Sequence, residues 1–192
     1  MKKILVITAI FLSSNLMIAQ NQTLSLGYGV VSTDQTIFTM SRIFTSIVYK
    51  VFEESYNFKS SSYTGPLTLS YHHTLERNER FSFGGSLAYE NAEFINTENG
   101  NDAFGYNAFT VAPEGKFKYL NPKNKFNMYA VLGLGITFFS YNNYERNETD
   151  VLRHINLQFT PLGFEYGGNV KGFLELGFGY KGIISGGIAF KF

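Results

Sequence analysis

The stretch Ile183-Ile-Ser-Gly-Gly-Ile-Ala-Phe-Lys-Phe192 decides the fold class of this chain. In an extended strand every second residue lies on the same face. One face would carry Ile184, Ile188, Phe190 and Phe192, and the other would carry Ser185, Gly187, Ala189 and Lys191. In water, a terminal strand with such an apolar face would promote aggregation. The stretch therefore predicts a strand whose apolar residues face outward and whose small residues face inward.

The same alternation recurs upstream, between short turn signals, which is typical of an all-β protein. It predicts eight strands, at residues 22–32, 62–75, 81–94, 107–120, 126–141, 154–166, 172–180 and 183–192. The connections alternate between long and short, as in an antiparallel up-and-down β-barrel, and an even strand count places both chain ends at the short-turn rim. The apolar phase switches at Pro161, which predicts a β-bulge there.

The residues on the second face decide which side of the barrel is the outside. A water-soluble barrel such as a lipocalin also alternates, but its solvent face would carry long charged side chains. Here that face carries glycine, serine and alanine, for example at Gly133, Gly135 and Ser86. A narrow eight-stranded bore needs small side chains, whereas hydrocarbon suits leucine, isoleucine and aromatic residues. The pattern predicts a transmembrane barrel with its bulky residues facing lipid.

Seven charged residues fall on the small-residue face, where acids and bases can pair. On the lipid face, each charge at mid-membrane would cost about 2–4 kcal/mol. They are Glu90, Glu114, Lys116, Lys118, Glu165, Glu175 and Lys191. We predict that they form an ionic network inside the bore, mostly in its periplasmic half. The favoured interpretation is a structural plug of paired charges. A proton or ion path is the alternative.

The segment 33–61 departs from the alternation. Apolar residues recur there at helical spacing, and Asp34 could cap the start of a helix. The segment is also rich in β-branched residues, so a pair of strands is the competing interpretation. We favour a short amphipathic helix within the first long loop, lying across the barrel mouth or on the membrane surface.

The N-terminus resembles a secretory signal. Lys2 and Lys3 precede a short apolar core, and cleavage before Gln20 would leave one domain, residues 20–192. A membrane anchor is the alternative, but the apolar run is shorter than the about 20 residues that a spanning helix needs. The net charge of +1 argues against a nucleic-acid partner, and the absence of cysteine excludes disulfides and thiolate metal sites.

Little in the chain predicts catalysis. Neighbouring residues His72 and His73 point to opposite faces of a strand, so they cannot share a metal ion, and we expect no metal and no cofactor. A membrane-embedded hydrolase needs a nucleophile, a histidine and an acid in contact. His73 with Ser70, or His154 with Glu145, are conceivable pairs, but no nucleophile motif supports them. We therefore expect a non-enzymatic protein.

The predicted signal 1–19, the eight alternating strands and the terminal Phe190-Lys-Phe192 resemble the small eight-stranded outer-membrane β-barrels of Gram-negative bacteria, the type of outer-membrane proteins A and X. The resemblance implies an outer-membrane location, an assembly signal at Ile188, Phe190 and Phe192, and partners that include outer-membrane lipid and the barrel-assembly machinery. It also implies a structural or surface-interaction role, with a membrane-embedded lipid-modifying hydrolase or a narrow pore or small-ligand carrier as alternatives.

Function concentrates in loops that a rigid scaffold presents. The long loops expected at 33–61, 96–106 and 142–153 are therefore the predicted extracellular contact surfaces. The first contact residues that we expect for a surface ligand are Tyr141, Tyr144, Arg146 and Arg153.

Overall fold

The computed structural model describes residues 21–41, 58–96, 102–122, 124–143 and 148–192. The predicted signal 1–19 lies outside these residues and stays a prediction. Eight strands form the fold: β1 Gln22–Val30, β2 Phe58–Leu75, β3 Asn78–Asn96, β4 Asp102–Lys118, β5 Phe126–Asn143, β6 Glu148–Gly167, β7 Val170–Gly179 and β8 Ile184–Lys191. Each strand pairs antiparallel with the next, and β8 pairs with β1, which closes the barrel.

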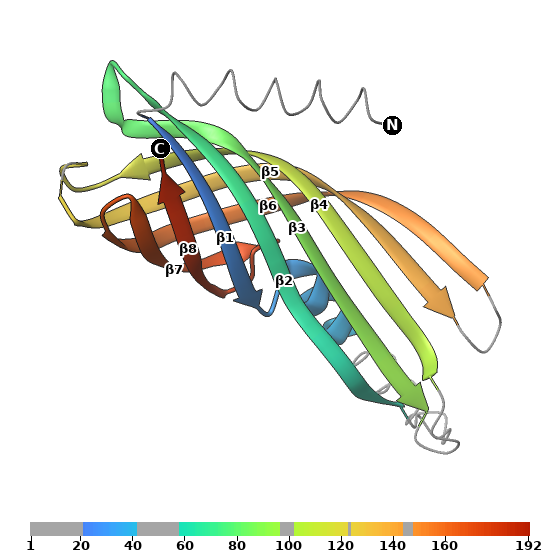
Figure 1. The fold of residues 1–192 in the computed structure, drawn as a ribbon. Helices are drawn as coiled ribbons and strands as arrows, with labels where there is room; N and C mark the ends of the chain where they lie inside the picture. The colour runs from blue at the N-terminus through green and yellow to red at the C-terminus, as the bar shows by residue number, and fades with distance from the viewer. Residues whose placement is uncertain (1–20, 42–57, 97–101, 123, 144–147) are drawn as a thin grey trace, which may run out of the picture.

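The all-β, eight-stranded, up-and-down barrel predicted from the alternation is thus confirmed. Figure 1 shows β1 beginning and β8 ending at the same rim. Gln22 and Phe192 join the two ends there, since the backbone N–H of each donates to the carbonyl of the other at 3.1 Å. Within the described residues, no helix has the length and hydropathy needed to cross a bilayer.

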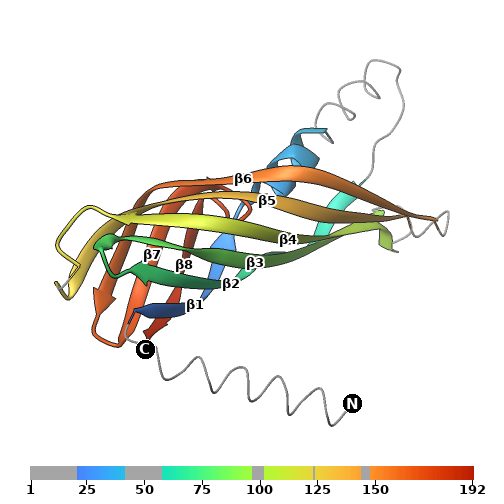
Figure 2. The same ribbon diagram turned by 90° about the horizontal axis from the view of Figure 1, so that it is seen from above.

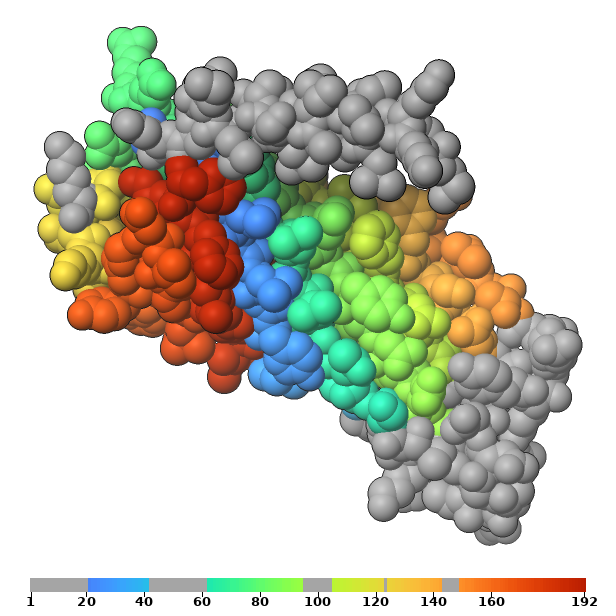
Figure 3. All heavy atoms as spheres, viewed as in Figure 1, coloured from blue at the N-terminus to red at the C-terminus, as the bar shows by residue number. Residues whose placement is uncertain are grey.

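The bulky apolar side chains point away from the bore. Leu132, Leu134 and Phe178 are each at least half exposed. Across the face seen in Figure 3, the side chains of β8, β1, β2 and β3 lie against one another as one surface. The opposite faces hold buried small or polar residues such as Ser86 and Thr137. The structure therefore has an apolar exterior and a polar interior, the reverse of a soluble calyx.

The small residues make room for two tyrosines that cross the bore. A Cβ atom at Gly133 would overlap the Tyr180 hydroxyl, and one at Gly163 would overlap the Tyr129 ring. Both tyrosines are almost fully buried. Glycine on this face is thus required by close approach, because the interior is packed with side chains and leaves no room for even one methyl group at these positions.

The predicted bulge at Pro161 is confirmed. Between Thr160 and Gly163, β6 has one residue more than β5, and the pairing of β6 with β7 shifts between Phe159 and Leu162. The Tyr119 hydroxyl donates a hydrogen bond to the Pro161 carbonyl at 2.8 Å. The bulge returns the apolar residues after Pro161 to the outside, which is what the phase switch in the sequence required.

Several predicted strand boundaries were wrong at the loop end of the barrel. The expected loops 96–106 and 142–153 are largely strand, because β4 begins at Asp102 and β6 at Glu148, and β2 begins already at Phe58. The outward residues turn polar near these segments, at Asn91, Asn107 and Ser140, and within them apolar residues such as Tyr106 and Leu152 lie on the inward face. The apolar-outside pattern that marks the other strands therefore ends there, although the hydrogen-bonded ladder continues.

The eight strands are unequal in length. β1, β7 and β8 have 9, 10 and 8 residues, whereas β2 to β6 have 17 to 20. The last pair joining β1 to β2 is Tyr28 with Leu67, and the last joining β7 to β6 is Gly179 with Gln158. Eight strands therefore enclose the bore only over a short section, beyond which β2 to β6 continue as an open wall (Figure 1).

The described part of the predicted helix, residues 33–41, follows β1 directly. Figures 1 and 2 show it beyond the end of β1, beside the projecting part of β6. Asp34 is not its cap, contrary to the prediction. Ser32 is, because its hydroxyl accepts the Gln35 N–H at 3.0 Å and its carbonyl accepts the Thr36 N–H. Asp34 is instead directed at β6.

Candidate functional site

The bore contains two clusters of buried charges, and the first surrounds Glu165 near the short-turn rim. Lys116 and Lys171 lie 2.8 and 2.7 Å from its carboxylate, and Lys118 lies at 3.6 Å. All four side chains are at most 11% exposed. Three cations on one carboxylate leave an excess of positive charge, which the Tyr129 ring partly offsets, because the Lys116 ammonium lies 3.5 Å from its centroid.

The second cluster surrounds Glu114, whose side chain is fully buried. Lys181 Nζ lies 2.8 Å from both of its carboxylate oxygens. The Tyr180 hydroxyl donates to it at 2.7 Å and the Ser86 hydroxyl at 2.9 Å. His72 Nε2 lies 3.2 Å away. Three hydrogen-bond donors, from Lys181, Tyr180 and Ser86, thus converge on one carboxylate, and such donors stabilise a buried charge.

Glu175 connects the two clusters. Its carboxylate accepts a hydrogen bond from Tyr129 at 2.9 Å and lies 3.9 Å from Lys181. The free space lined by both clusters is about 10 Å³, which is about the minimum that one water molecule needs. Among the described residues, side chains rather than water therefore fill this section of the bore.

Two further contacts lie where the helix meets the barrel, and the first is at Glu90. Its carboxylate is buried and accepts hydrogen bonds from Ser32 at 2.8 Å and Tyr63 at 3.3 Å. The Ser32 hydroxyl therefore caps the helix with its oxygen and donates a hydrogen bond to the carboxylate of Glu90 in β3. This arrangement fixes the start of the helix to the barrel wall.

The second contact joins the helix to β6 through Asp34. Its side chain is 4% exposed and lies 2.7 Å from His154 Nε2, while Asn156 donates to its other oxygen at 2.9 Å. Burial raises the pKa of Asp34 above its usual value, and the charge of His154 opposes that shift. These contacts occupy a part of β6 that has no β7 partner within the described residues.

A cavity of about 340 Å³ lies between the helix and the inner faces of β5 and β6. Ile37, Phe38, Phe139 and Leu152 form its apolar wall. Asp34, Ser41 and His154 supply its polar groups. Phe38 fixes the helix in place, since its ring packs 5.0 Å from that of Tyr106 and 6.4 Å from that of Phe139. The volume falls within the range of small-ligand pockets.

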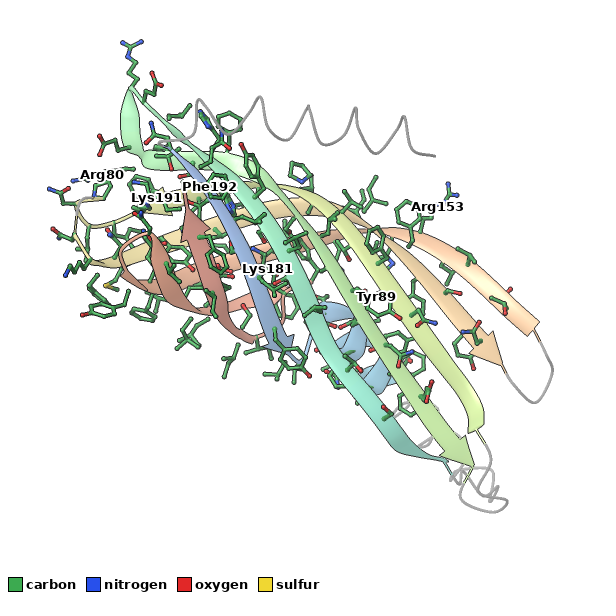
Figure 4. The ribbon with its side chains drawn as sticks, viewed as in Figure 1. Arg80, Tyr89, Arg153, Lys181, Lys191 and Phe192 are labelled. Carbon is green, nitrogen blue, oxygen red and sulfur yellow. The ribbon has the colours of Figure 1, made fainter. Side chains whose placement is uncertain are left out.

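The structure brings five of the seven predicted bore charges into the two clusters and separates two from them. The five are Glu114, Lys116, Lys118, Glu165 and Glu175. Glu90 lies apart, with hydroxyl partners. Lys191 is exposed at the rim and has no ion pair within the described part of the chain. Figure 4 shows Lys191 next to Phe192 at the rim, away from Lys181.

Sequence reasoning missed Lys181 and Lys171, which complete the clusters. Lys181 lies in the turn between β7 and β8, where strand alternation gives no prediction. That turn requires Gly182, whose φ of 92° few other residues adopt, and its geometry directs Lys181 into the bore. Lys171 lies second in β7 and has the same phase as Glu175, so counting along the strand could have found it.

The predicted contact residues have different positions. Tyr141 is in β5, as the predicted strand 126–141 had it, and is half buried against Phe38, with ring centroids 6.3 Å apart, so it supports the helix instead of facing a ligand outside the barrel. Arg153 is exposed on the outward face of β6, over the Phe138 ring at 5.5 Å, and Figure 4 shows it pointing away from the barrel. Tyr144 and Arg146 lie outside the described residues.

The predicted assembly signal lies on the outward face of the last strand. Ile188, Phe190 and Phe192 are 39 to 50% exposed, and Phe190 pairs with Leu24 across the β8–β1 seam. Their assembly role stays a prediction.

Of the two conceivable hydrolase pairs, His73 with Ser70 is not formed, and His154 with Glu145 does not lie fully within the described residues. Ser70 is buried in the bore, whereas His73 is on the outward face and packs edge-on against Phe83. Glu145 lies outside the described residues, and the acid that meets His154 is Asp34. The described residues contain no group of three or more His, Cys, Asp or Glu side chains placed to hold a metal ion.

No protein-family model matches this chain, and no curated protein is significantly similar to it.

Proposed function

We propose that this chain is an integral outer-membrane β-barrel of the A/X-like type, with a structural or surface-interaction role and no enzymatic activity. The supporting observation is the size of the closed section. Its shortest strands have 8 to 10 residues, close to the about 9–11 tilted residues that cross a hydrocarbon core. An apolar exterior one bilayer thick, around a polar interior, suits lipid and not water.

The open wall of β2 to β6 would then project beyond the membrane. Its outward residues Tyr89, Asn91 and Asn107 are joined by hydrogen bonds of 2.9 Å, and the polar surface begins there. Strand edges without partners are tolerated outside hydrocarbon but are costly within it. The projecting wall, which carries Arg153 on its outward face, is the surface that we propose for contact with a ligand outside the cell.

Cysteine labelling tests this location and orientation, because the chain has no cysteine of its own. In intact Gram-negative cells, a membrane-impermeant maleimide should label Asp150→Cys at the projecting end and spare Glu79→Cys at the short-turn rim. Both positions are exposed, so both should be labelled after lysis. Equal labelling of the two variants in intact cells would contradict the proposal.

The packed clusters around Glu114 and Glu165 suit a plug rather than a pore. In planar bilayers the purified protein should show no steady single-channel conductance between about pH 5 and pH 8, because the charges that fill the bore are paired. A 16-stranded porin in the same bilayers is the positive control. Steady ion conductance through the wild-type protein would instead favour the alternative of a proton or ion path.

A further inference from the structure

The cavity beneath the helix has apolar walls and a polar end formed by the Asp34–His154 pair. Ile37, Phe38, Phe139 and Leu152 form the walls, and Ser41, whose hydroxyl donates to the Phe38 carbonyl, is the other polar residue of the lining. A volume of about 340 Å³ accommodates an alkyl chain of about ten carbons, if each takes about the 30 Å³ of a water molecule. The cavity thus matches one flexible chain in size and is too small for a two-chain phospholipid.

The polar end can bind an oxygen atom. Asp34 occupies Nε2 of His154, so Nδ1 is the ring nitrogen left for a ligand. Nδ1 can donate to a carboxylate when the ring is protonated, or accept from a hydroxyl when it is neutral. The His154 side chain is 38% exposed, so a head group can reach it without displacing Asp34.

The mouth of the cavity adjoins the outer border of the apolar exterior. Ile37 and Leu152 line the cavity and are also 60 and 61% exposed, so they form its rim. Ile155, at 76%, extends this apolar surface onto the outward face of β6. At this height β6 lacks its β7 neighbour within the described residues, so the inner and outer faces of the wall meet at a free edge.

We propose that this cavity binds a single-chain amphiphile, a fatty acid or fatty alcohol, with its chain against Phe38 and Phe139 and its head oxygen on His154 Nδ1. The proposal rests on the membrane location proposed above, because the ligand would enter from the outer border of the lipid, next to which the free edge of β6 begins. It predicts a saturable site, distinct from simple partition of the amphiphile into the bilayer.

Two neighbouring residues provide a reporter and its control, because the chain contains no tryptophan. Phe139→Trp would put the fluorophore in the cavity wall, and Phe138→Trp would put it on the outward face. In phosphatidylcholine nanodiscs titrated with 12-bromododecanoic acid, Phe139→Trp should be quenched saturably, and unbrominated dodecanoic acid should restore its emission. Phe138→Trp should show only a linear, unsaturable decrease.

The head-group contact is tested in the Phe139→Trp background. His154→Gln should weaken binding of 12-bromododecanoic acid about tenfold, because it removes the ring nitrogen that would contact the head group and keeps a side chain that can still bond Asp34. If Phe139→Trp proves poorly folded, Leu152→Trp at the rim serves as reporter, with Ile155→Trp as its outward control.

The outcomes separate the two proposals. Nanodiscs that contain brominated phosphatidylcholine should quench Leu132→Trp, at the centre of the outward face of β5, and failure to do so would overturn the membrane location itself. If Leu132→Trp is quenched by that lipid but Phe139→Trp shows no saturable response to the brominated acid, the membrane barrel stands and the amphiphile site is wrong.

Discussion

Replacing Glu114 by glutamine should destabilise the barrel by about 3–5 kcal/mol, because it leaves Lys181 buried without a close counter-charge. The nearest remaining carboxylate, that of Glu175, lies 3.9 Å from the ammonium. Lys181→Met should cost less, since Glu114 would keep Tyr180 and Ser86 as donors. The free energies of unfolding are measured by urea titration in lipid vesicles. The folded fraction at each urea concentration is read from the difference in gel mobility between the folded and the unfolded barrel.

The double variant Glu114→Gln with Lys181→Met decides whether the pair itself is responsible. It should be more stable than Glu114→Gln alone, with a coupling of about 2–3 kcal/mol, because no unpaired ammonium remains in the bore. Lys191→Met is the matched control, since Lys191 is exposed on the same face at the rim, and it should change stability by less than about 0.5 kcal/mol. Strictly additive single effects would contradict a coupled pair.

The parts of this fold that the sequence could predict are those governed by local periodicity. Residue parity along a strand placed Glu114 and Glu165 inside and Leu132 outside, because the side-chain period of two holds wherever the strand is regular. The Pro161 bulge was also predictable, since one inserted residue shifts the apolar positions of the strand from odd to even residue numbers, and the sequence shows that shift. The upper ends of β4 and β6 were not, because apolar residues such as Tyr106 and Leu152 lie on the inward face there, so the apolar-outside pattern no longer holds.

The parts that could not be predicted depend on contacts between distant residues. Asp34 and His154 are 120 positions apart, and local signals alone made Asp34 look like a helix cap. Ser32, two residues earlier, takes that role while it also binds Glu90, 58 positions away. Lys181 enters the bore through a turn whose direction depends on Gly182. Such pairings form because barrel closure brings distant residues together, and no short stretch of sequence shows which residues will meet.

The strongest test of sidedness is an arginine in the middle of the apolar exterior. Leu132 lies at the centre of the outward stretch Phe126–Phe138 of β5 and is 59% exposed. If lipid surrounds this surface, Leu132→Arg should cost about 2–4 kcal/mol in vesicles, because the guanidinium must enter hydrocarbon. The measurement is again urea unfolding followed by the mobility shift.

Ser140→Arg supplies the control for this change on the same strand. Ser140 lies eight residues further along the same face, at the polar end of β5, where an arginine should cost at most about 1 kcal/mol. In a water-soluble barrel both arginines would be exposed to solvent, and surface substitutions typically stay within about 0.5 kcal/mol of wild type. A large cost at Leu132 and a small one at Ser140 therefore requires lipid around the first position only. Equal and small costs would mean that the exposed leucines and phenylalanines face something other than hydrocarbon.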